Sequence, residues 1–409
     1  MRQQHPGLAL GILTGLNLLN YLDRYVMSGA LPLILADLAI SKGQAGSLQS
    51  AFMLTYMVMS FAAGYVGDRA RRLVLAVVGV TIWSLATVGS GLAWGFGALL
   101  FARCLVGVGE ASYAVVTPSL ISDLYPVDRR ARAMAVFYAA IPLGSALGFV
   151  LGAQIGESHG WRTAFFVAGG PGLVLALSLL FVKEPPRGRF DAPTARPLGR
   201  PLRESLLYLW RRPSFVVNTA AQAIYTFTQG GLAFWMPTYF VQERGLAVGQ
   251  AGTVFGGVLI VAGLLGTIIG GQVGDALARR SQAAHFSFSG WALVATAPFT
   301  LLAVLAPQPA IFWPSMFVTL FLLFLNTGPL NAAVANVLPP DLRAIGFGIN
   351  TVAIHLFGDF PSPYLIGKAA DQIGLRTPVL IAGLLLVPSG LVLLLWRNTL
   401  VRDMKVPPA

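Results

Sequence analysis

The stretch Gly64-Tyr-Val-Gly-Asp68-Arg69-Ala-Arg71-Arg72 decides the fold, because the chain contains it twice. Its second copy reads Gly271-Gln-Val-Gly-Asp275-Ala-Leu-Ala-Arg279-Arg280 and lacks the arginine that directly follows the aspartate. A further pair of similar stretches, Pro126–Ala131 and Pro339–Ala344, follows in the same order. Two matches in register indicate that the chain consists of two duplicated halves.

The composition of the chain is that of a membrane protein. Of its 409 residues, 56% are hydrophobic and 11% are charged, whereas a soluble domain has about 25% charged residues. Apolar stretches of roughly 20 residues, which are long enough to cross a bilayer, recur along the whole chain. We therefore predict an all-α polytopic membrane protein, located in the plasma membrane or, in a bacterium, in the inner membrane.

Twelve membrane-spanning helices are predicted, six in each half. Their ranges are 8–36, 44–67, 73–93, 96–122, 131–155, 161–183, 213–241, 249–275, 284–306, 310–337, 344–367 and 374–396. A parallel duplication of six-helix halves is the plan of major facilitator superfamily transporters.

The expected domains follow from these spans. They are an N-terminal six-helix bundle at 1–183 and a C-terminal six-helix bundle at 213–409, which ends in a short cytoplasmic tail. Residues 184–212 are rich in proline and arginine and are predicted to form a cytoplasmic linker. A short surface helix is expected within this linker near Arg203–Trp210.

The basic residues are distributed unevenly between the two sides of the membrane. With both termini on one side, that side receives 21 of the 28 Lys and Arg residues and the other side receives 5, while Arg24 and Arg103 lie within spans. An excess of basic residues marks the cytoplasmic side, so both termini are predicted to be cytoplasmic. The same distribution accounts for the net charge of +12 without nucleic acid as a partner.

Four charged residues of the first half lie inside apolar stretches: Asp23, Arg24, Arg103 and Glu110. A charge inside a membrane segment is costly and usually marks a transport path. Counting along each helix, Asp23 lies about 24 Å from the cytoplasmic face and Arg103 about 10 Å below the opposite face. In an apolar core of about 30 Å these depths overlap, and Glu110 lies two turns beyond Arg103 on the same helix face.

The interpretation we favour assigns these charges to transport. Glu110 and Asp23 are the predicted proton-coupling residues, and Glu110 is expected to titrate, because burial favours the neutral form of a carboxyl group. Arg24, Arg103 and Glu110 are the predicted substrate-binding residues. The arginines are expected to hold an anionic head group, with Asp23 as their resting partner. The alternative is a purely structural network of salt bridges.

The repeated motif is predicted to belong to a cytoplasmic gate. Gly64 and Gly67 allow two helices to approach closely, and an acid followed by arginines can lock one half against the other in one conformation. The predicted gate residues are Asp68, Arg69, Arg71, Arg72 and Asp275. The alternative is that these charges only flank the end of a helix.

Secondary candidates lie in the second half. His355 and Asp359 are spaced i, i+4 and can interact, either as a second proton site or as a bond that holds helix ends together. Thr228 and Gln229 precede Gly230–Gly231, a pair that can let a helix break beside the site.

Glycines recur every four residues at Gly144, Gly148 and Gly152. This spacing permits tight packing against a neighbouring helix. We expect the contact to cross between the two halves.

Motifs of other functional classes are missing from the sequence. It has no Gly-x-x-x-x-Gly-Lys phosphate loop and no His-Glu-x-x-His zinc site, so neither ATP hydrolysis nor zinc chemistry is expected. The single cysteine, Cys104, excludes an internal disulfide and a cysteine metal cluster. We therefore expect no cofactor, no metal and no enzymatic activity, with an ion or substrate gradient as the energy source.

Five stretches of the chain resemble the spinster (Spns) family of the major facilitator superfamily. They are Asn20–Arg24, Gly64–Arg72, Arg103–Ala111, Lys183–Gly188 and Gly358–Gly367. The resemblance implies that the four matched charges, Asp23, Arg24, Arg103 and Glu110, line a central cavity. It also implies kinship with eukaryotic members that export lysophospholipids or sphingosine 1-phosphate, although the compact chain resembles a bacterial member whose substrate can differ.

The predicted function is secondary active transport by alternating access. We expect coupling to protons and an amphiphilic anion, such as a lysophospholipid or sphingoid phosphate, as substrate. One alternative is a proton-coupled transporter of small organic anions or drugs. Another is a membrane receptor or enzyme that uses the same buried charges. The expected partners are the substrate, protons and the bilayer, with the protein acting as a monomer.

Overall fold

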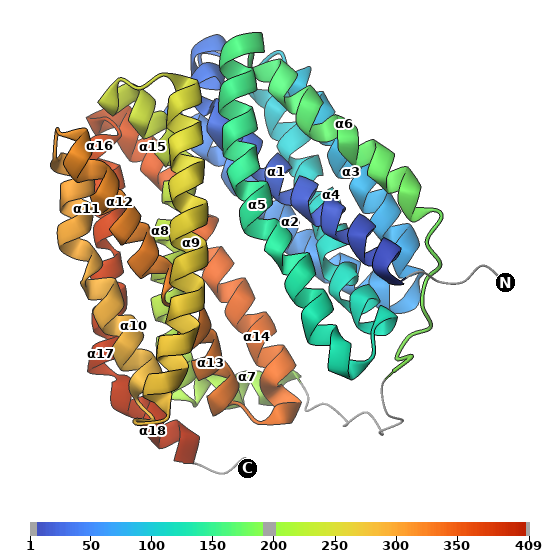
Figure 1. The fold of residues 1–409 in the computed structure, drawn as a ribbon, viewed down its shortest axis with the longest axis vertical. Coiled ribbons are helices and arrows are strands. Elements are labelled where there is room, and N and C mark those ends of the chain that lie inside the picture. The colour runs from blue at the N-terminus through green and yellow to red at the C-terminus, as the bar shows by residue number, and fades with distance from the viewer. Residues whose placement is uncertain (1–5, 191–201, 406–409) are drawn as a thin grey trace. The chain divides into compact units, whose positions relative to one another are not determined.

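The computed structural model describes residues 6–190 and 202–405, and every regular element in these ranges is a helix (Figure 1). Contacts divide the chain into two compact units, each described by itself below. The first unit comprises Met1–Thr194 and Phe234–Gly257, and the second comprises Ala195–Ala233 and Val258–Ala409. The predicted domain boundaries, which keep 213–409 together, stay a prediction.

Six helices belong wholly to the first unit. They are α1 (Pro6–Asp37), α2 (Lys42–Arg69), α3 (Arg72–Gly91), α4 (Phe96–Leu124), α5 (Val127–His159) and α6 (Trp161–Leu179). They coincide with the first six predicted spans.

The remaining helices follow in the second half of the chain. They are α7 (Leu202–Trp210), α8 (Pro213–Arg244), α9 (Val248–Ala278), α10 (Ala284–Val294), α11 (Thr296–Leu305), α12 (Pro309–Phe324), α13 (Thr327–Val337), α14 (Pro340–Ile354), the π-helix η1 (His355–Asp359), α15 (Ser362–Ile373), α16 (Arg376–Leu384), α17 (Leu386–Leu395) and α18 (Arg397–Lys405). Consecutive pairs such as α10–α11 and α16–α17 each form one predicted span.

Within the described ranges, nine helical segments are long and apolar enough to cross a membrane. They are α2, α3, α4, α5, α6, α9, α10–α11, α12–α13 and α16–α17. The other three predicted spans are α1, α8 and the segment α14–η1–α15. Each of these three contains polar residues inside the helix, for example Asp23, Gln222 and Asp359, which lower its mean hydropathy. Asp23 and Arg24 lie in α1 and Asp359 in the last of these segments, whereas Arg103 and Glu110 lie in α4, one of the nine.

The glycine stripe of α5 packs within the first unit. Gly144, Gly148 and Gly152 lie against backbone carbonyls of α1 between Leu18 and Val26, so closely that a Cβ atom on any of them would clash. The expectation that these glycines pack between the two halves is therefore wrong. Their spacing predicts close approach, but it does not identify the partner helix.

The start of α9 also packs on α5, which explains why it groups with the first unit. Glu157 Oε2 accepts a hydrogen bond of 2.8 Å from the backbone nitrogen of Gly249. Gln154 Nε2 donates to the carbonyl of Gly249 at 3.2 Å and to Thr253 Oγ1 at 2.9 Å. A carboxylate at the N-terminus of a helix satisfies a backbone donor that has no partner within the helix.

The predicted short surface helix is confirmed as α7 (Leu202–Trp210). Leu209 is buried in the core of the second unit, while Leu206, Leu207 and Trp210 are exposed. At the other end of the chain, Asp403 of α18 accepts hydrogen bonds from the backbone nitrogen and Oγ of Ser214, at 2.9 and 2.7 Å. Residues 191–201, in the middle of the predicted linker, lie outside the described residues.

A further repeat joins the last two spans of each half. Gly160-Trp-Arg162-Thr connects α5 to α6, and Gly374-Leu-Arg376-Thr connects α15 to α16. Both glycines adopt positive φ, 85° and 75°, a conformation that favours glycine at the end of a helix. The duplication of the chain therefore extends to these two corners.

Candidate functional site

Arg24 of α1 and Glu110 of α4 form a buried ion pair in the first unit. Glu110 Oε2 lies 2.7 Å from Nη2 and 3.2 Å from Nε of Arg24. The side chain of Glu110 is 0% exposed and that of Arg24 is 12% exposed. Removing one partner of such a pair leaves the other charge buried without compensation.

Glycines of α4 bring this helix close enough for the pair to form. Gly107 lies against the backbone of α2 at Phe52, and Gly109 lies against the backbone of α3 at Gly79. A Cβ atom at either glycine would clash with its neighbour. Because α4 is in contact with two helices just before Glu110, the carboxylate is held in the interior of the unit.

Three aromatic rings surround the guanidinium of Arg24. Its Cζ lies 4.9 Å from the ring centroid of Tyr21, 5.2 Å from that of Phe52 and 5.0 Å from that of Tyr56. These distances are within the range of cation–π attraction. The rings stabilise the cation and separate the ion pair from water.

Arg103 is buried beside the same aromatic group. Its Cζ lies 4.7 Å from the ring centroid of Phe52, and its Nη2 donates to Gln49 Oε1 at 3.3 Å. In the described part of the chain, no carboxylate lies within ion-pair distance of Arg103. Arg24 and Arg103 therefore share one phenyl ring, and only Arg24 is neutralised by a direct partner.

Asp23 faces a different helix from Arg24. It is buried, and its Oδ2 accepts a hydrogen bond of 3.2 Å from Thr87 Oγ1 on α3. Among the described residues it forms no ion pair with either arginine, so the expectation that it is their resting partner needs correction. Successive residues of an α-helix point about 100° apart. Asp23 therefore faces α3, while Arg24 faces α4.

Several buried polar atoms around the ion pair have no hydrogen-bond partner among the described residues. They are Oε1 of Glu110, Oδ1 of Asp23, Nδ2 of Asn20 and Nε of Arg103. Buried polar atoms are nearly always satisfied, and exceptions call for a functional explanation. Asn20 lies near Glu110 and Trp83 lies near Asp23, close enough for weak hydrogen bonds. The polar atoms of the cluster are therefore incompletely satisfied and can bind a proton, a water molecule or a substrate.

The predicted gate motif contains one deeply buried arginine. Arg72 Nη1 donates to Asp123 Oδ2 at 2.6 Å, Nε donates to Glu184 Oε1 at 3.2 Å, and Nη2 donates to the carbonyl of Pro185 at 3.2 Å. The backbone nitrogen of Arg72 donates to Glu184 Oε1 as well. These bonds join α3 and α4 to the segment that follows α6, all within the first unit.

The other gate residues lie at the surface. Asp68 and Arg71 are exposed, and Arg69 lies over the ring of Tyr65 at 3.6 Å. The guanidinium of Arg187 donates to the carbonyls at the end of α2, including that of Asp68. Asp275 is exposed on the second unit. Because these contacts lie inside one unit or face outward, the role of these residues in a gate stays a prediction.

His355 and Asp359 form a partly exposed pair in the second unit. Nδ1 of His355 lies 2.9 Å from Oδ1 and 3.0 Å from Oδ2 of Asp359, and the two side chains are 28% and 15% exposed. The pair spans the π-helix η1, a type of interruption that is frequent at functional sites. The predicted interaction between the two residues is therefore confirmed, while its role stays a prediction.

The helix break expected at Gly230–Gly231 does not occur there. α8 continues without interruption from Pro213 to Arg244. The two glycines instead make room for Asp359 and Ser362 of the facing segment. Thr228 Oγ1 is occupied by a hydrogen bond of 2.6 Å to the carbonyl of Ala382, and Gln229 is half-buried.

The second unit contains an uncharged polar network that the sequence did not reveal. Thr219 Oγ1 donates to Asn350 Oδ1 at 2.8 Å, and Asn350 Nδ2 donates to Gln222 Oε1 at 3.4 Å. In the first unit, Asn20 lies one turn before Arg24 and was not predicted as a site residue. An i, i+4 search for amides next to the buried charges finds Asn20, whereas no simple pattern distinguishes Asn350 from other asparagines.

No group of three or more His, Cys, Asp or Glu side chains in the described ranges could hold a metal ion. Cys104 is half-buried and free. The charged cluster itself consists of two acids and two guanidinium groups, and guanidinium groups are suited to bind carboxylates and phosphates.

Comparisons with known proteins agree with this architecture. The family model of the Major Facilitator Superfamily matches residues 13–363. The chain is 34% identical to protein spinster homolog 1 of Homo sapiens over 392 residues, which cover 91% of this chain and 74% of the human protein. It is 32% identical to the sphingosine-1-phosphate transporter SPNS2 of Danio rerio, with 91% of this chain and 78% of that protein covered.

A solved structure shows the same fold. The crystal structure of a bacterial homolog to the human lysosomal transporter spinster, in an inward-facing and unoccupied conformation, superposes with a TM-score of 0.91. It covers 99% of both chains at 23% identity. The D-xylose-proton symporter matches with a TM-score of 0.74 at 18% identity. The predicted all-helical fold of the Major Facilitator Superfamily is therefore confirmed, while the count of twelve spans and the cytoplasmic position of both termini stay predictions.

The chain is a multi-pass membrane transporter of the plasma membrane, or of the inner membrane in a bacterium, and not an enzyme. Two observations support this assignment: the family model matches most of the chain, and the chain is more than 30% identical to spinster proteins. The chain belongs to the spinster family of the Major Facilitator Superfamily.

Proposed function

We propose that this spinster-type transporter moves an amphiphilic anion, such as a lysophospholipid or sphingoid phosphate, by alternating access coupled to protons. The observation that carries the proposal is the geometry of Glu110. One of its oxygens accepts both hydrogen bonds from Arg24, while the other is buried and makes no hydrogen bond to Arg24. This second oxygen can take up a proton without displacing the guanidinium of Arg24.

Protonation of Glu110 changes the charge of the cluster. With both acids ionised, the charges of Asp23 and Glu110 balance those of Arg24 and Arg103. A proton on Glu110 leaves one net positive charge and weakens the hydrogen bonds that hold Arg24. The two guanidinium groups then present donors to an anionic head group, which they can bind in a bidentate manner.

The surroundings of the arginines favour an amphiphilic substrate. Phe52 contacts both guanidinium groups, and the nearby Met53 and Met57 are buried. Methionine side chains adapt to apolar partners of irregular shape. The name of one relative, a sphingosine-1-phosphate transporter, supports the same class of substrate.

We retain the gate and the second-unit residues within this proposal. Arg72, with its bonds to Asp123 and Glu184, is the residue of the repeated motif best placed to respond to a movement of α2 and α3. His355 and Asp359 are proposed to line the substrate's path in the second unit. We propose that the protein acts as a monomer.

The substrate class is tested by binding to the purified protein. Lipids that co-purify are identified by mass spectrometry, and the affinity for a sphingoid phosphate is compared between the wild type and Arg103→Ala. Loss of a charge-assisted hydrogen bond, worth about 1.5–3 kcal/mol, predicts roughly 10- to 100-fold weaker binding. The matched control is Arg71→Ala, because Arg71 is exposed.

Equal affinity of Arg103→Ala and the wild type for the phosphorylated lipid contradicts the head-group role. Binding of small organic anions, with no binding of lipids, supports the alternative substrate class instead.

A further inference from the structure

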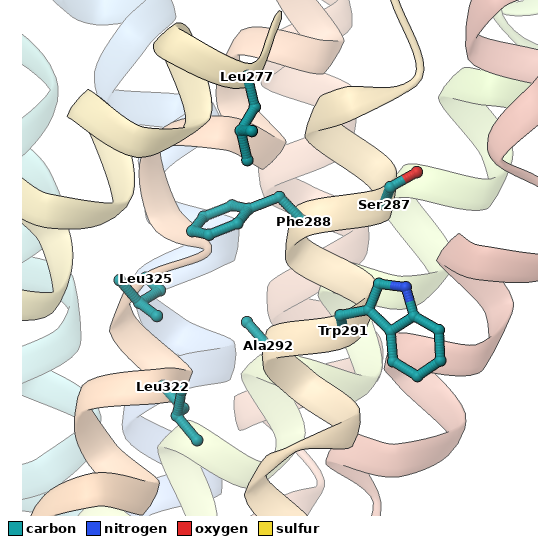
Figure 2. A pocket seen from close by; sticks show the side chains of 7 residues that line it. All are labelled: Leu277, Ser287, Phe288, Trp291, Ala292, Leu322 and Leu325. Carbon is teal, nitrogen blue, oxygen red and sulfur yellow. The ribbon is translucent and has the colours of Figure 1, made fainter. Parts of the chain in front are cut away.

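An apolar groove of about 480 Å³ lies on the second unit between α9, α10 and α12 (Figure 2). Its lining residues are Leu277, Ser287, Phe288, Trp291, Ala292, Leu322 and Leu325. Figure 2 shows Phe288 pointing from α10 toward Leu325, while the small side chain of Ala292 leaves the space beside Leu322 open.

Small residues on α9 and on α10 shape the walls of the groove. Gly266 and Gly270 of α9 lie against the backbone of α12 and the residue that follows it, at Phe321 and Leu325, with no room for a Cβ atom. α9 and α12 therefore form one continuous wall, and α10 forms the other wall with only a methyl group at Ala292. Trp291 is 62% exposed, so the groove opens to the surroundings of a membrane-spanning unit.

Charged residues gather at the end of the groove formed by Leu277. Arg279 and Arg280 follow Leu277 within one turn and are exposed, as is Asp275 before it. The net charge of these three side chains is positive. Beneath them, His285 at the start of α10 is only 4% exposed, and its Nδ1 is buried without a hydrogen-bond partner in the described part of the chain.

We propose that this groove is a binding site for an anionic phospholipid of the membrane leaflet at that end. One acyl chain lies along Phe288, Ala292 and Leu322, and the phosphate contacts Arg279 and Arg280. Charge complementarity argues for this occupant, because a pair of arginines beside an apolar groove matches the phosphate and tail of one lipid. Basic pockets between transmembrane helices are known to hold anionic head groups in this way.

This site is independent of the proposed transport function. It shares no residue with the charged cluster of α1 and α4, which belongs to the first unit. A lipid bound there is a resident of the protein surface and not cargo. Measurements of lipid binding therefore test this proposal independently of the proposed transport function.

The test uses the full chain in detergent, with phosphatidylglycerol and phosphatidylcholine as probes. Native mass spectrometry measures bound lipid, and the shift in thermal midpoint measures stabilisation. We expect wild type to bind phosphatidylglycerol more tightly than phosphatidylcholine. At about 1 kcal/mol per basic residue, the double variant Arg279→Gln/Arg280→Gln is expected to bind phosphatidylglycerol roughly 30-fold more weakly.

Two further variants make the test specific. Lys368→Gln/Arg376→Gln removes the same charge from exposed positions on α15 and α16, outside the groove, and is expected to bind like wild type. Ala292→Phe fills the space beside Leu322 (Figure 2) and is expected to reduce the binding of both lipids. If Ala292→Phe does not fold, the variants at exposed arginines still test the proposal. Equal binding of phosphatidylglycerol by wild type and Arg279→Gln/Arg280→Gln overturns the proposal, as does equal affinity of the wild type for the two lipids.

Discussion

The two units hold their buried polar residues in different ways. In the first unit, Arg24 and Glu110 form an ion pair whose carboxylate is fully buried, and Arg103 lies beside it without a direct acidic partner. In the second unit, the ion pair of His355 and Asp359 is partly exposed. Charge in a membrane protein interior is costly and marks functional positions. We therefore propose that the first unit carries the coupling chemistry.

The uncharged residues of the second unit complete the contrast. Thr219, Gln222 and Asn350 form hydrogen bonds with each other and carry no charge that a proton could change at working pH. Such groups can recognise a substrate or line its path. We infer that the duplicated halves have diverged into one that binds charge and one that shapes the path.

The repeated loop motif shows the same divergence. Arg72 is buried among Asp123, Glu184 and the carbonyl of Pro185, whereas Asp275, Arg279 and Arg280 are exposed. The second copy has lost the arginine after the aspartate. The same ancestral motif therefore stabilises the first unit and leaves its charges free on the second.

The largest effect is expected from Arg24→Met. This change leaves the carboxylate of Glu110 buried without its cation, which costs about 3–5 kcal/mol and is expected to abolish transport. Thermal unfolding in detergent and substrate uptake in liposomes measure the two effects. The double variant Arg24→Met/Glu110→Gln is expected to regain stability but not transport, because it removes the unpaired charge.

The control for Arg24→Met is His355→Gln in the second unit, where the remaining Asp359 is partly exposed. It is expected to lose much less stability. If Arg24→Met unfolds at the same temperature as wild type, Arg24 does not stabilise the buried carboxylate of Glu110.

A smaller loss of stability is expected from a change in the first copy of the loop motif, and almost none from a change in the second copy. Arg72→Ala leaves the buried Asp123 without its guanidinium and is expected to cost roughly 3 kcal/mol of stability. Arg279→Ala, at an exposed position, is expected to change stability by no more than about 0.5 kcal/mol. Chemical or thermal unfolding of both variants measures the difference, and equal losses would remove this part of the contrast between the units.

The smallest effect concerns the repeated corners at Arg162 and Arg376. Hydrogen bonds from Arg162, and secondly from Trp161, lower the pKa of Asp37 at the end of α1 below its ordinary value. Stability from this pair is therefore present above the unfolded pKa of about 3.9 and is lost as pH falls through the lower folded value. Both side chains are largely in solvent, so the effect is expected to be small.

Thermal unfolding between pH 6 and pH 2 measures the contribution of the Asp37–Arg162 pair to stability. Asp37→Asn is expected to lose part of the acid sensitivity of wild type, whereas Arg376→Gln is expected to keep all of it. An unchanged acid profile in Asp37→Asn contradicts the assignment.

The fold and the charged cluster were largely predictable from the sequence. Charges stand out inside apolar stretches, and 1.5 Å of rise per residue correctly placed α1 and α4 residues at overlapping depths. Depth does not determine direction around a helix, however. The sequence therefore could not show that Glu110, rather than Asp23, is the partner of Arg24, or that Asp23 bonds to Thr87.

Other features depend on tertiary packing that no local pattern reveals. Tyr21, Phe52 and Tyr56 surround Arg24, but aromatic residues occur throughout the chain and have no distinguishing spacing. The glycines of α5 predicted a close contact and not its partner. The π-helix at His355–Asp359 was missed, because its interruption depends on contacts with α8 at Gly230.

We propose that Glu110 couples transport to protons and that Asp359 does not. Wild type, Glu110→Gln and Asp359→Asn are reconstituted in liposomes, and proton movement driven by a substrate gradient is measured alongside substrate movement. We expect Glu110→Gln to move substrate without protons and Asp359→Asn to keep the wild-type ratio of protons to substrate. Unchanged proton movement in Glu110→Gln, with intact substrate movement, contradicts the proposed role of Glu110.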